Sequence, residues 1–270
     1  MAQDRAKKVL ILGGDGYLGW PTAMYLARLG YKVAAVDNYF RRWACHELNV
    51  EPLVDVPNMQ LRAQIYKGLT KQTIPAAVGD ITNYPFLQKV FEGRIFGEAW
   101  GEGPPDAVVH YAEQPSAPYS MIDREKAVFT LTNNLVGTTN LIHAVKEYNP
   151  DCHIVKLGTM GVYGTPNIDI EEGYLDVEHK GRKHTFLYPK CPGSLYHLTK
   201  AQDGDLLYWG YENAGLCGQV EYSGVETIGW YVSYWDSDVP YGRTSLMQFR
   251  AVTPTTPTEE RSLSAIKSLY

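Results

Sequence analysis

A glycine-rich turn near the start of the chain limits the possible folds more than any other feature. Residues 9–13 form an apolar run typical of a buried strand, and a Gly-Gly-Asp-Gly-Tyr-Leu-Gly turn at residues 13–19 follows at once. Gly13, Gly16 and Gly19 would allow a tight turn, close approach of a bound group and packing of a helix on the strand. A helix start attracts phosphate through its free N–H groups. The turn predicts a dinucleotide pyrophosphate site, with an ordinary strand–helix turn as the alternative.

Strands and helices alternate along the first two hundred residues. Apolar runs predict five strands, at residues 9–13, 32–37, 74–79, 107–112 and 153–158. Helical periodicity predicts helices at residues 17–29, at 41–71 (two helices), at 125–148 and at 196–213. Such alternation is typical of a parallel sheet covered by helices on both faces. We therefore expect an α/β fold with a Rossmann-type, doubly wound parallel sheet.

The later part of the chain is harder to interpret. Residues 159–195 are rich in Gly and Pro, and a loop of this length is usually functional. Beyond residue 213 the periodicity fades, and no regular element is predicted. We expect two parts: an NAD-binding Rossmann domain at residues 7–213 and an incomplete or divergent C-terminal region at residues 214–270.

Composition argues against several functional classes. The 270 residues are 44% hydrophobic and 20% charged, an ordinary balance for a chain that buries a core. A formal net charge of -5 argues against a nucleic-acid partner. The four cysteines form no C-x-x-C pair, so no metal site is predicted and a reducing compartment is expected. No run of 18 apolar residues occurs, which predicts a cytoplasmic chain without a membrane partner.

An acidic residue ends the second predicted strand. A carboxylate at Asp37 can accept both hydroxyls of a ribose and would repel a 2′-phosphate, which favours NAD over NADP. Arg41 and Arg42 follow closely and weaken this preference, because arginine can hold a 2′-phosphate. Asp80 and Ile81 follow the third strand, where an adenine contact is expected. The alternative for both acids is a plain turn residue.

A tyrosine and a lysine four residues apart suggest acid–base chemistry. On a helix, Tyr196 and Lys200 share one face, and the lysine would stabilise a phenolate. A phenolate can take a proton from a sugar hydroxyl while hydride leaves the same carbon. Thr159, at the end of the fifth strand, can bond to the same hydroxyl. The alternative is a surface pair without function, but the glycine turn and Asp37 favour a catalytic pair.

Polar residues also follow the fourth strand. His110, Glu113 and Gln114 lie where the carboxyl edge of a parallel sheet binds ligands. We interpret His110 as a buried core histidine rather than a catalytic group.

Several segments together resemble one protein family. The chain is similar to the extended short-chain dehydrogenases, the NAD-dependent epimerases and dehydratases, and within them to the branch that builds the sulfolipid head group. The resemblance covers roughly residues 7–202. Its segments are GGDGYLGW (13–20), VDNYFRR (36–42), VGDI (78–81), SAPYSMIDR (116–124), VKLGTMGVYGTPNIDIEEGY (155–174) and YHLTK (196–200). The stretch at 155–174 is specific to that branch.

The resemblance implies a reaction. It implies tightly held NAD, with UDP-glucose and sulfite as substrates and a homodimer as the assembly. Tyr196, with Lys200 and Thr159, would oxidise C4 of the sugar. The 4-keto group would acidify the C5 proton, water would leave from C6, sulfite would add, and hydride would return to C4.

The resemblance and the motifs together imply the site residues. The cofactor set is Gly13, Gly16, Tyr17, Leu18, Gly19, Asp37, Asn38, Arg41, Arg42, Asp80, Ile81, Tyr111, Glu113, Asn133, Tyr196 and Lys200. The substrate set is Gln114, Ser116, Tyr119, Ser120, Thr159, Met160 and Gly161. The catalytic residues are Thr159, Tyr196 and Lys200.

Three departures from the family pattern keep alternatives open. Val162 stands where the family has Glu, Pro115 stands where many members have Arg, and residues 203–270 do not follow the family's nucleotide-sugar domain, of which 214–270 would be a remnant. One alternative is another NAD-dependent sugar-nucleotide epimerase or dehydratase. A second is a truncated, non-catalytic NAD-binding protein.

Overall fold

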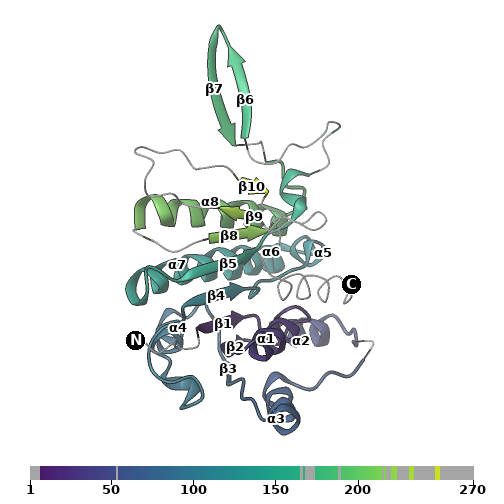
Figure 1. Ribbon diagram of the computed structural model, residues 1–270. Coiled ribbons are helices and arrows are strands. Elements are labelled where there is room, and N and C mark those ends of the chain that lie inside the picture. The colour runs from purple at the N-terminus through teal and green to yellow at the C-terminus, as the bar shows by residue number, and fades with distance from the viewer. Residues whose placement is uncertain are drawn as a thin grey trace, which may run out of the picture.

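The structure is a computed structural model, shown in Figure 1. It describes residues 7–52, 54–164, 167, 174–187, 190–214, 216, 220–223, 231–233 and 247–249. None of the helices in these ranges is long and apolar enough to cross a membrane.

One large sheet forms the centre of the fold. Its strands are β1 (Lys8–Leu12), β2 (Lys32–Asp37), β3 (Ala76–Val78), β4 (Ala107–His110), β5 (His153–Leu157), β8 (Val220–Ser223), β9 (Tyr231–Ser233) and β10 (Met247–Phe249). The strand order is β10-β9-β8-β5-β4-β1-β2-β3, and every pairing from β3 to β8 is parallel. The order β3-β2-β1-β4-β5-β8 is that of the doubly wound dinucleotide-binding fold, so the predicted fold class is confirmed.

Helices cover both faces of this sheet (Figure 1). They are α1 (Gly19–Arg28), α2 (Phe40–Glu47), α3 (Met59–Thr70), α4 (Tyr84–Glu92), α5 (Ala117–Ser120), α6 (Arg124–Leu131), α7 (Gly137–Tyr148) and α8 (Leu195–Ala214), with short helical turns η1 (Arg94–Phe96), η2 (Thr132–Val136) and η3 (Met160–Tyr163). Alternate residues of β1 enter different cores: Leu10 and Leu12 pack with α4 and α7, whereas Val9 and Ile11 pack with α1 and α3. Burial on both faces explains why β1 is continuously apolar.

The glycine turn fastens β1 to β2. The N–H groups of Gly13 and Gly14 both donate to the carbonyl oxygen of Val36, at 2.8 and 2.9 Å. Gly13 has a φ of 88°, which favours glycine. A Cβ on Gly19 would lie 2.0 Å from the Gly13 carbonyl oxygen, so α1 starts this close to β1 only because Gly19 has no side chain.

The segment at residues 159–195 is more ordered than the sequence predicted. It contains η3 and an antiparallel hairpin of β6 (Tyr174–His179) and β7 (Arg182–Leu187), which stands away from the body in Figure 1. The turn between its strands is Lys180–Gly181, both with positive φ, as two-residue hairpin turns require. The described side chains of the hairpin are mostly exposed. Apolar and polar residues alternate only over residues 175–178 of β6 and not in β7, which is too short a pattern to predict the strands.

The C-terminal region also contains strands that the sequence did not predict. β8 lies parallel to β5, and β9 and β10 continue the sheet with antiparallel pairing. The division into a domain at 7–213 and a region at 214–270 stays a prediction.

A pair of glycine substitutions tests the turn. Gly19→Ala should lower the free energy of unfolding by about 1–3 kcal/mol, because the new Cβ overlaps the Gly13 carbonyl. Gly68→Ala is the control, since this exposed glycine of α3 has open space around it and alanine there should stabilise the helix by roughly 0.5–1 kcal/mol. Denaturant unfolding measures both, and equal stability of the two variants would contradict this account of the turn.

Candidate cofactor and active site

A pocket opens at the carboxyl edge of the sheet, beside β1 and β4. This is the point where the strand order reverses, which is where open α/β sheets bind ligands. The space in and in front of this open pocket, solvent at its mouth included, is about 850 Å³. The predicted cofactor residues that line it are Gly13, Gly16, Tyr17, Leu18, Gly19, Asp37, Asn38, Arg41, Ile81, Tyr111, Glu113 and Asn133. The rest of that set, Arg42, Asp80, Tyr196 and Lys200, lie outside this lining.

Asp37 is held in place at one end of the pocket. Its two carboxylate oxygens accept hydrogen bonds from the backbone N–H groups of Tyr39 and Asp15, at 2.7 and 2.9 Å. Burial raises the pKa of Asp37, and these two backbone donors oppose the shift. Each oxygen keeps a further lone pair, so the carboxylate can still accept from a ribose.

Asp80 lies outside the pocket lining and holds one of its residues in place. It accepts a hydrogen bond from the side-chain amide of Asn38 at 3.0 Å, and Asn38 is itself in the lining. The other oxygen of Asp80 accepts from the backbone N–H and the hydroxyl of Thr82. Asp80 therefore orients Asn38, and Ile81 contributes the apolar wall.

The two arginines after β2 lie in different places. Arg41 is exposed, lines the pocket and lies 5.2 Å from the ring centroid of Tyr17. Arg42 instead forms two hydrogen bonds with the carboxylate of Asp15, at 2.6 and 3.0 Å. The cofactor-binding assignments of both residues stay predictions.

The Tyr–Lys pair lies at the start of α8. Lys200 is 3% exposed, donates to the Leu157 carbonyl oxygen at 2.6 Å and forms an ion pair with Glu113. Its ammonium nitrogen is 5.8 Å from the ring centroid of Tyr196. Burial lowers the pKa of Lys200, and the charges of Tyr196 and Asp203 oppose this. A buried ammonium this close would stabilise the phenolate of Tyr196.

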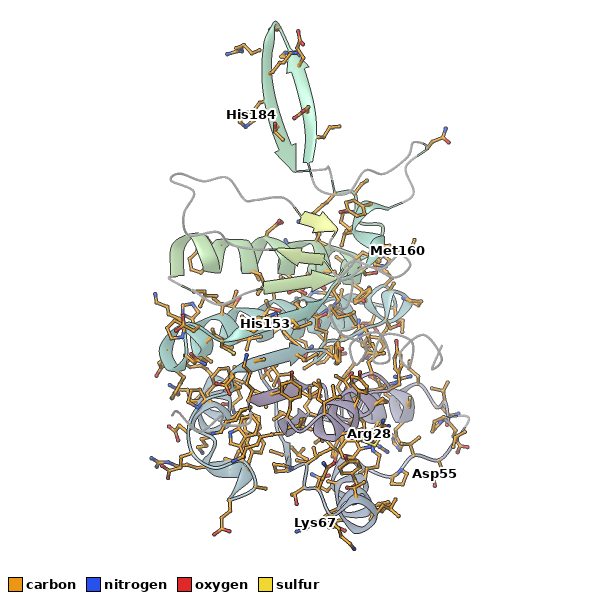
Figure 2. The ribbon with its side chains drawn as sticks, viewed as in Figure 1. Arg28, Asp55, Lys67, His153, Met160 and His184 are labelled. Atoms are coloured by element: carbon orange, nitrogen blue, oxygen red, sulfur yellow. The ribbon has the colours of Figure 1, made fainter. Side chains whose placement is uncertain are left out.

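The loop after β5 brings a hydroxyl to the same edge. Thr159 begins η3, and its Oγ1 accepts a hydrogen bond from the Gly161 N–H at 3.3 Å. A Cβ on Gly161 would lie 2.3 Å from the His197 ring, so this loop packs directly on α8. Figure 2 shows Met160 on this loop, and its side chain is 49% exposed.

The remaining predicted substrate residues bond within the protein. Gln114 is fully buried and donates to the hydroxyl of Thr130 at 2.7 Å. Ser116 caps α5, and the hydroxyl of Tyr119 donates to Glu47 at 3.0 Å. Ser120 accepts a hydrogen bond from the backbone N–H of Tyr196 at 3.1 Å, which fixes the start of α8. Their contact with a substrate stays a prediction.

A π-helical turn interrupts the helix predicted at residues 125–148. This turn, η2, separates α6 from α7 and contains Asn133 and Asn134. The Asn134 side chain accepts from the Gln114 N–H and donates to the Thr199 hydroxyl, each at 2.9 Å. Thr199 in turn donates to the Tyr196 carbonyl oxygen at 2.7 Å. π-Turns are common at functional sites, and two adjacent asparagines inside an apolar helix were the available signal.

Lys200 belongs to a group of four buried charges. Glu113 forms ion pairs with both Lys156 and Lys200, and Lys156 also lies 3.3 Å from Asp203. All four side chains are at most 3% exposed. Asp203 also accepts from the Thr138 hydroxyl at 2.8 Å. The sequence analysis missed Lys156 and Asp203, although a lysine inside an apolar strand signals a buried partner.

His110 is a buried core histidine, as predicted. It is fully buried and pairs in register with Lys156 across β4 and β5. Burial, followed by the charges of Lys156 and Lys200, lowers the pKa of His110 well below its ordinary value. The imidazole is therefore neutral near pH 7. In the described part of the chain, no group of three His, Cys, Asp or Glu residues could hold a metal ion.

Comparisons with known proteins identify relatives. Residues 9–202 match the NAD dependent epimerase/dehydratase family. The chain is 49% identical to the chloroplastic UDP-sulfoquinovose synthase of Spinacia oleracea over 73% of this chain and 39% of that protein. It is 42% identical to the UDP-sulfoquinovose synthase of Sulfolobus acidocaldarius over 77% of this chain and 51% of that protein. The chain thus spans about two fifths to half the length of these relatives.

A solved structure supports the fold. The UDP-glucose 4-epimerase of Bifidobacterium longum, in complex with NAD+ and UDP, superposes with a TM-score of 0.56 at 21% identity. The match covers 80% of this chain and 52% of that one.

Removing one of the four buried charges should be costly. Asp203→Ala leaves Lys156 and Thr138 without this partner, and the free energy of unfolding should fall by about 3–5 kcal/mol. Glu178→Ala removes the exposed pair with Lys183 on the hairpin and should leave stability unchanged within error. Denaturant unfolding measures the free energy of unfolding of both variants. A negligible decrease in Asp203→Ala would contradict the structural role of this charge.

Neutral His110 should make stability depend on pH. An unfolded histidine binds a proton near pH 6.5, whereas the folded chain keeps His110 unprotonated. The stabilisation is therefore present above that pH and lost as pH falls, by up to about 1.4 kcal/mol per pH unit. His110→Gln should reduce the slope between pH 7.5 and 5.5 in denaturant titrations. An unchanged slope in His110→Gln would refute the assignment.

Proposed function

The chain belongs to the NAD-dependent epimerase/dehydratase family, and from this premise we propose that it converts UDP-glucose and sulfite to UDP-sulfoquinovose. The observation that carries the proposal is the buried Lys200 beside Tyr196, next to the dinucleotide pocket. Identity to two UDP-sulfoquinovose synthases supports this substrate class.

The cofactor half of the site fits NAD. The turn at residues 13–19 leaves no room for side chains at Gly13 and Gly19, so the backbone itself can face a pyrophosphate. Asp37 would accept the ribose hydroxyls, and Ile81 would contact the adenine. When bound, NAD supplies an acceptor for the hydride of the sugar C4 and returns it later.

The chain's own residues would move the proton. Tyr196 takes the proton of the C4 hydroxyl as a phenolate, Lys200 stabilises that phenolate, and Thr159 bonds to the same hydroxyl. The resulting 4-keto sugar has an acidic C5 proton, so water leaves from C6 and sulfite adds to the enone. The net change is addition of sulfite with loss of one water. Ser120 and Thr199 hold the backbone of Tyr196 and act as positioning residues.

One observation favours a second function. Val162 is 4% exposed and apolar, at the position where the family pattern has Glu, so no carboxylate assists elimination from there. Pro115 lines the pocket where many family members have Arg, which removes one anion contact. A sugar-nucleotide epimerase or dehydratase would share the C4 oxidation and need neither residue. For either function, the proposed assembly is a homodimer and the proposed location is the cytoplasm. The spinach relative is described as chloroplastic.

Removal of one hydroxyl tests the catalytic assignment. Tyr196→Phe should lower kcat by roughly 10²–10⁴-fold, because general acid–base assistance is lost. NAD binding should persist. Tyr31→Phe, at a partly exposed tyrosine remote from α8 in sequence, is the control and should keep full activity. Steady-state kinetics with UDP-glucose and sulfite measures the loss, and less than a tenfold decrease would exclude the assigned role of Tyr196.

The products of the same incubation separate the functions. UDP-sulfoquinovose formed only with sulfite supports the synthase. A 4-keto sugar or a C4 epimer formed without sulfite supports the epimerase or dehydratase. Bound NAD without turnover, unchanged by Tyr196→Phe, supports a non-catalytic NAD-binding protein.

A further inference from the structure

We propose that Asp15, inside the glycine turn, sets the preference for NAD over NADP by holding Arg42 away from a 2′-phosphate. The inference rests on the proposed function, in that the pocket must bind a nicotinamide dinucleotide. It assigns Asp15 a role in specificity that is separate from that of Asp37.

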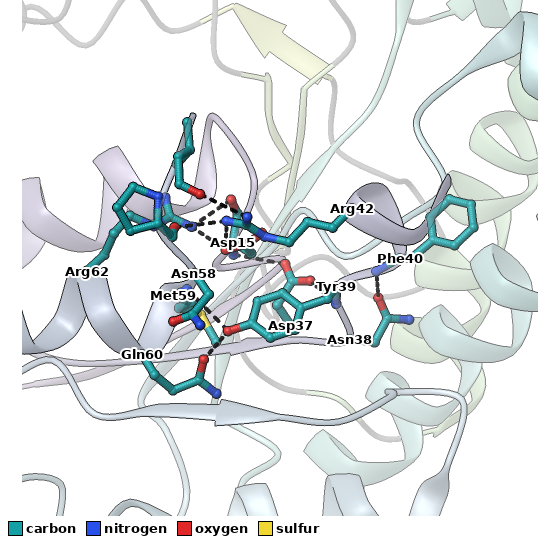
Figure 3. Close-up of polar contacts among 12 residues, drawn as sticks. Asp15, Asp37, Asn38, Tyr39, Phe40, Arg42, Asn58, Met59, Gln60 and Arg62 are labelled. Atoms are coloured by element: carbon teal, nitrogen blue, oxygen red, sulfur yellow. Dashed lines mark hydrogen bonds and ion pairs between the residues drawn. The ribbon is translucent and has the colours of Figure 1, made fainter. Parts of the chain in front are cut away.

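Two arginines converge on Asp15 from separate helices (Figure 3). Arg42, from α2, donates through Nε and Nη2 to the two carboxylate oxygens. Arg62, from α3, forms an ion pair with the same carboxylate and donates to the Asp15 carbonyl oxygen at 2.9 Å. The Asp15 side chain is 8% exposed and that of Arg62 is 13% exposed, so water screens their pair weakly, whereas Arg42 is 37% exposed.

This cluster adjoins the carboxylate that would bind the ribose. The backbone N–H of Asp15 donates to Asp37 at 2.9 Å, and both residues line the pocket. A phosphate on the ribose 2′ oxygen would therefore arrive beside Asp15. Arg42 is the side chain suited to receive it, because a guanidinium binds phosphate oxygens in pairs.

Arg42 has little capacity left for such a ligand. It makes four hydrogen bonds: two to Asp15 and one each to the carbonyl oxygens of Val56 and Pro57, both at 2.9 Å. Its guanidinium also lies 5.6 Å from the Tyr39 ring centroid. A 2′-phosphate would have to displace the Asp15 carboxylate from this guanidinium. The positive charge that would otherwise attract NADP is thus neutralised within the protein.

Arg41 is a further basic group at this end of the pocket. It is exposed and lies over the Tyr17 ring, and no contact described for it involves Asp15. A test must therefore separate Arg42 from Arg41, which a double variant does.

Equilibrium binding of NAD and NADP to the full chain tests the inference without turnover. Titration calorimetry would compare the unchanged chain with Asp15→Asn, Arg42→Ala and the double variant. Asp15→Asn should shift the ratio of the two Kd values at least about tenfold toward NADP, since it frees a charge-assisted phosphate contact. The double variant should lose that gain. Arg42→Ala alone should bring no gain of NADP affinity, because Arg42 is already occupied by Asp15 and its loss leaves the carboxylate less neutralised.

The outcomes distinguish this inference from the proposed function. If the unchanged chain binds neither NAD nor NADP, the proposed function fails and the inference fails with it. If it binds NAD but Asp15→Asn leaves the ratio unchanged, only the inference is overturned. Retention of the gain in the double variant assigns it to another group, such as Arg41 or Arg62, and also overturns the inference. Should Asp15→Asn not fold, a gain of NADP affinity in Arg42→Ala would still overturn it.

Discussion

The buried carboxylate of Glu113 is the contact on which the site depends. It follows β4 and forms ion pairs with Lys156 of β5 and Lys200 of α8. Charges removed from water are tolerated only with partners, so these three elements must come together in one arrangement. Asp203 and Lys156 add a second pairing between β5 and α8. The position of Tyr196 over the sheet edge follows from where this network holds α8.

The two ends of the candidate site differ in the interactions that arrange them. At the glycine turn, backbone N–H groups and the carboxylates of Asp15 and Asp37 arrange charge along the pocket. At the start of α8, the ammonium of Lys200 is buried beside the ring of Tyr196. The π-turn η2 contacts both parts, because Asn133 lines the pocket and the side chain of Asn134 donates a hydrogen bond to Thr199 of α8. A cofactor bound along this edge would span both ends.

The elements that were predicted from the sequence are those with a pattern visible in a short stretch of residues. The five apolar strands, the glycine turn and α8 were predicted because burial on both faces or a helical repeat marks them locally. The hairpin of β6 and β7 was missed, since apolar alternation is limited to four residues of β6 and most of its described side chains are exposed. β8 was missed because its place beside β5 is a long-range pairing. The family was recognised from motifs, which record chemistry as well as fold.

The sequence by itself determined the order of the strands β1 to β5 and the doubly wound class, and it marked Asp37, Tyr196 and Lys200 as candidates, because each has a local pattern. Only the tertiary structure decided which charges meet. Lys156 and Asp203 are distant in sequence, and Arg42 could have pointed into the pocket rather than toward Asp15. Such pairings depend on how separate elements pack, and no local periodicity encodes them.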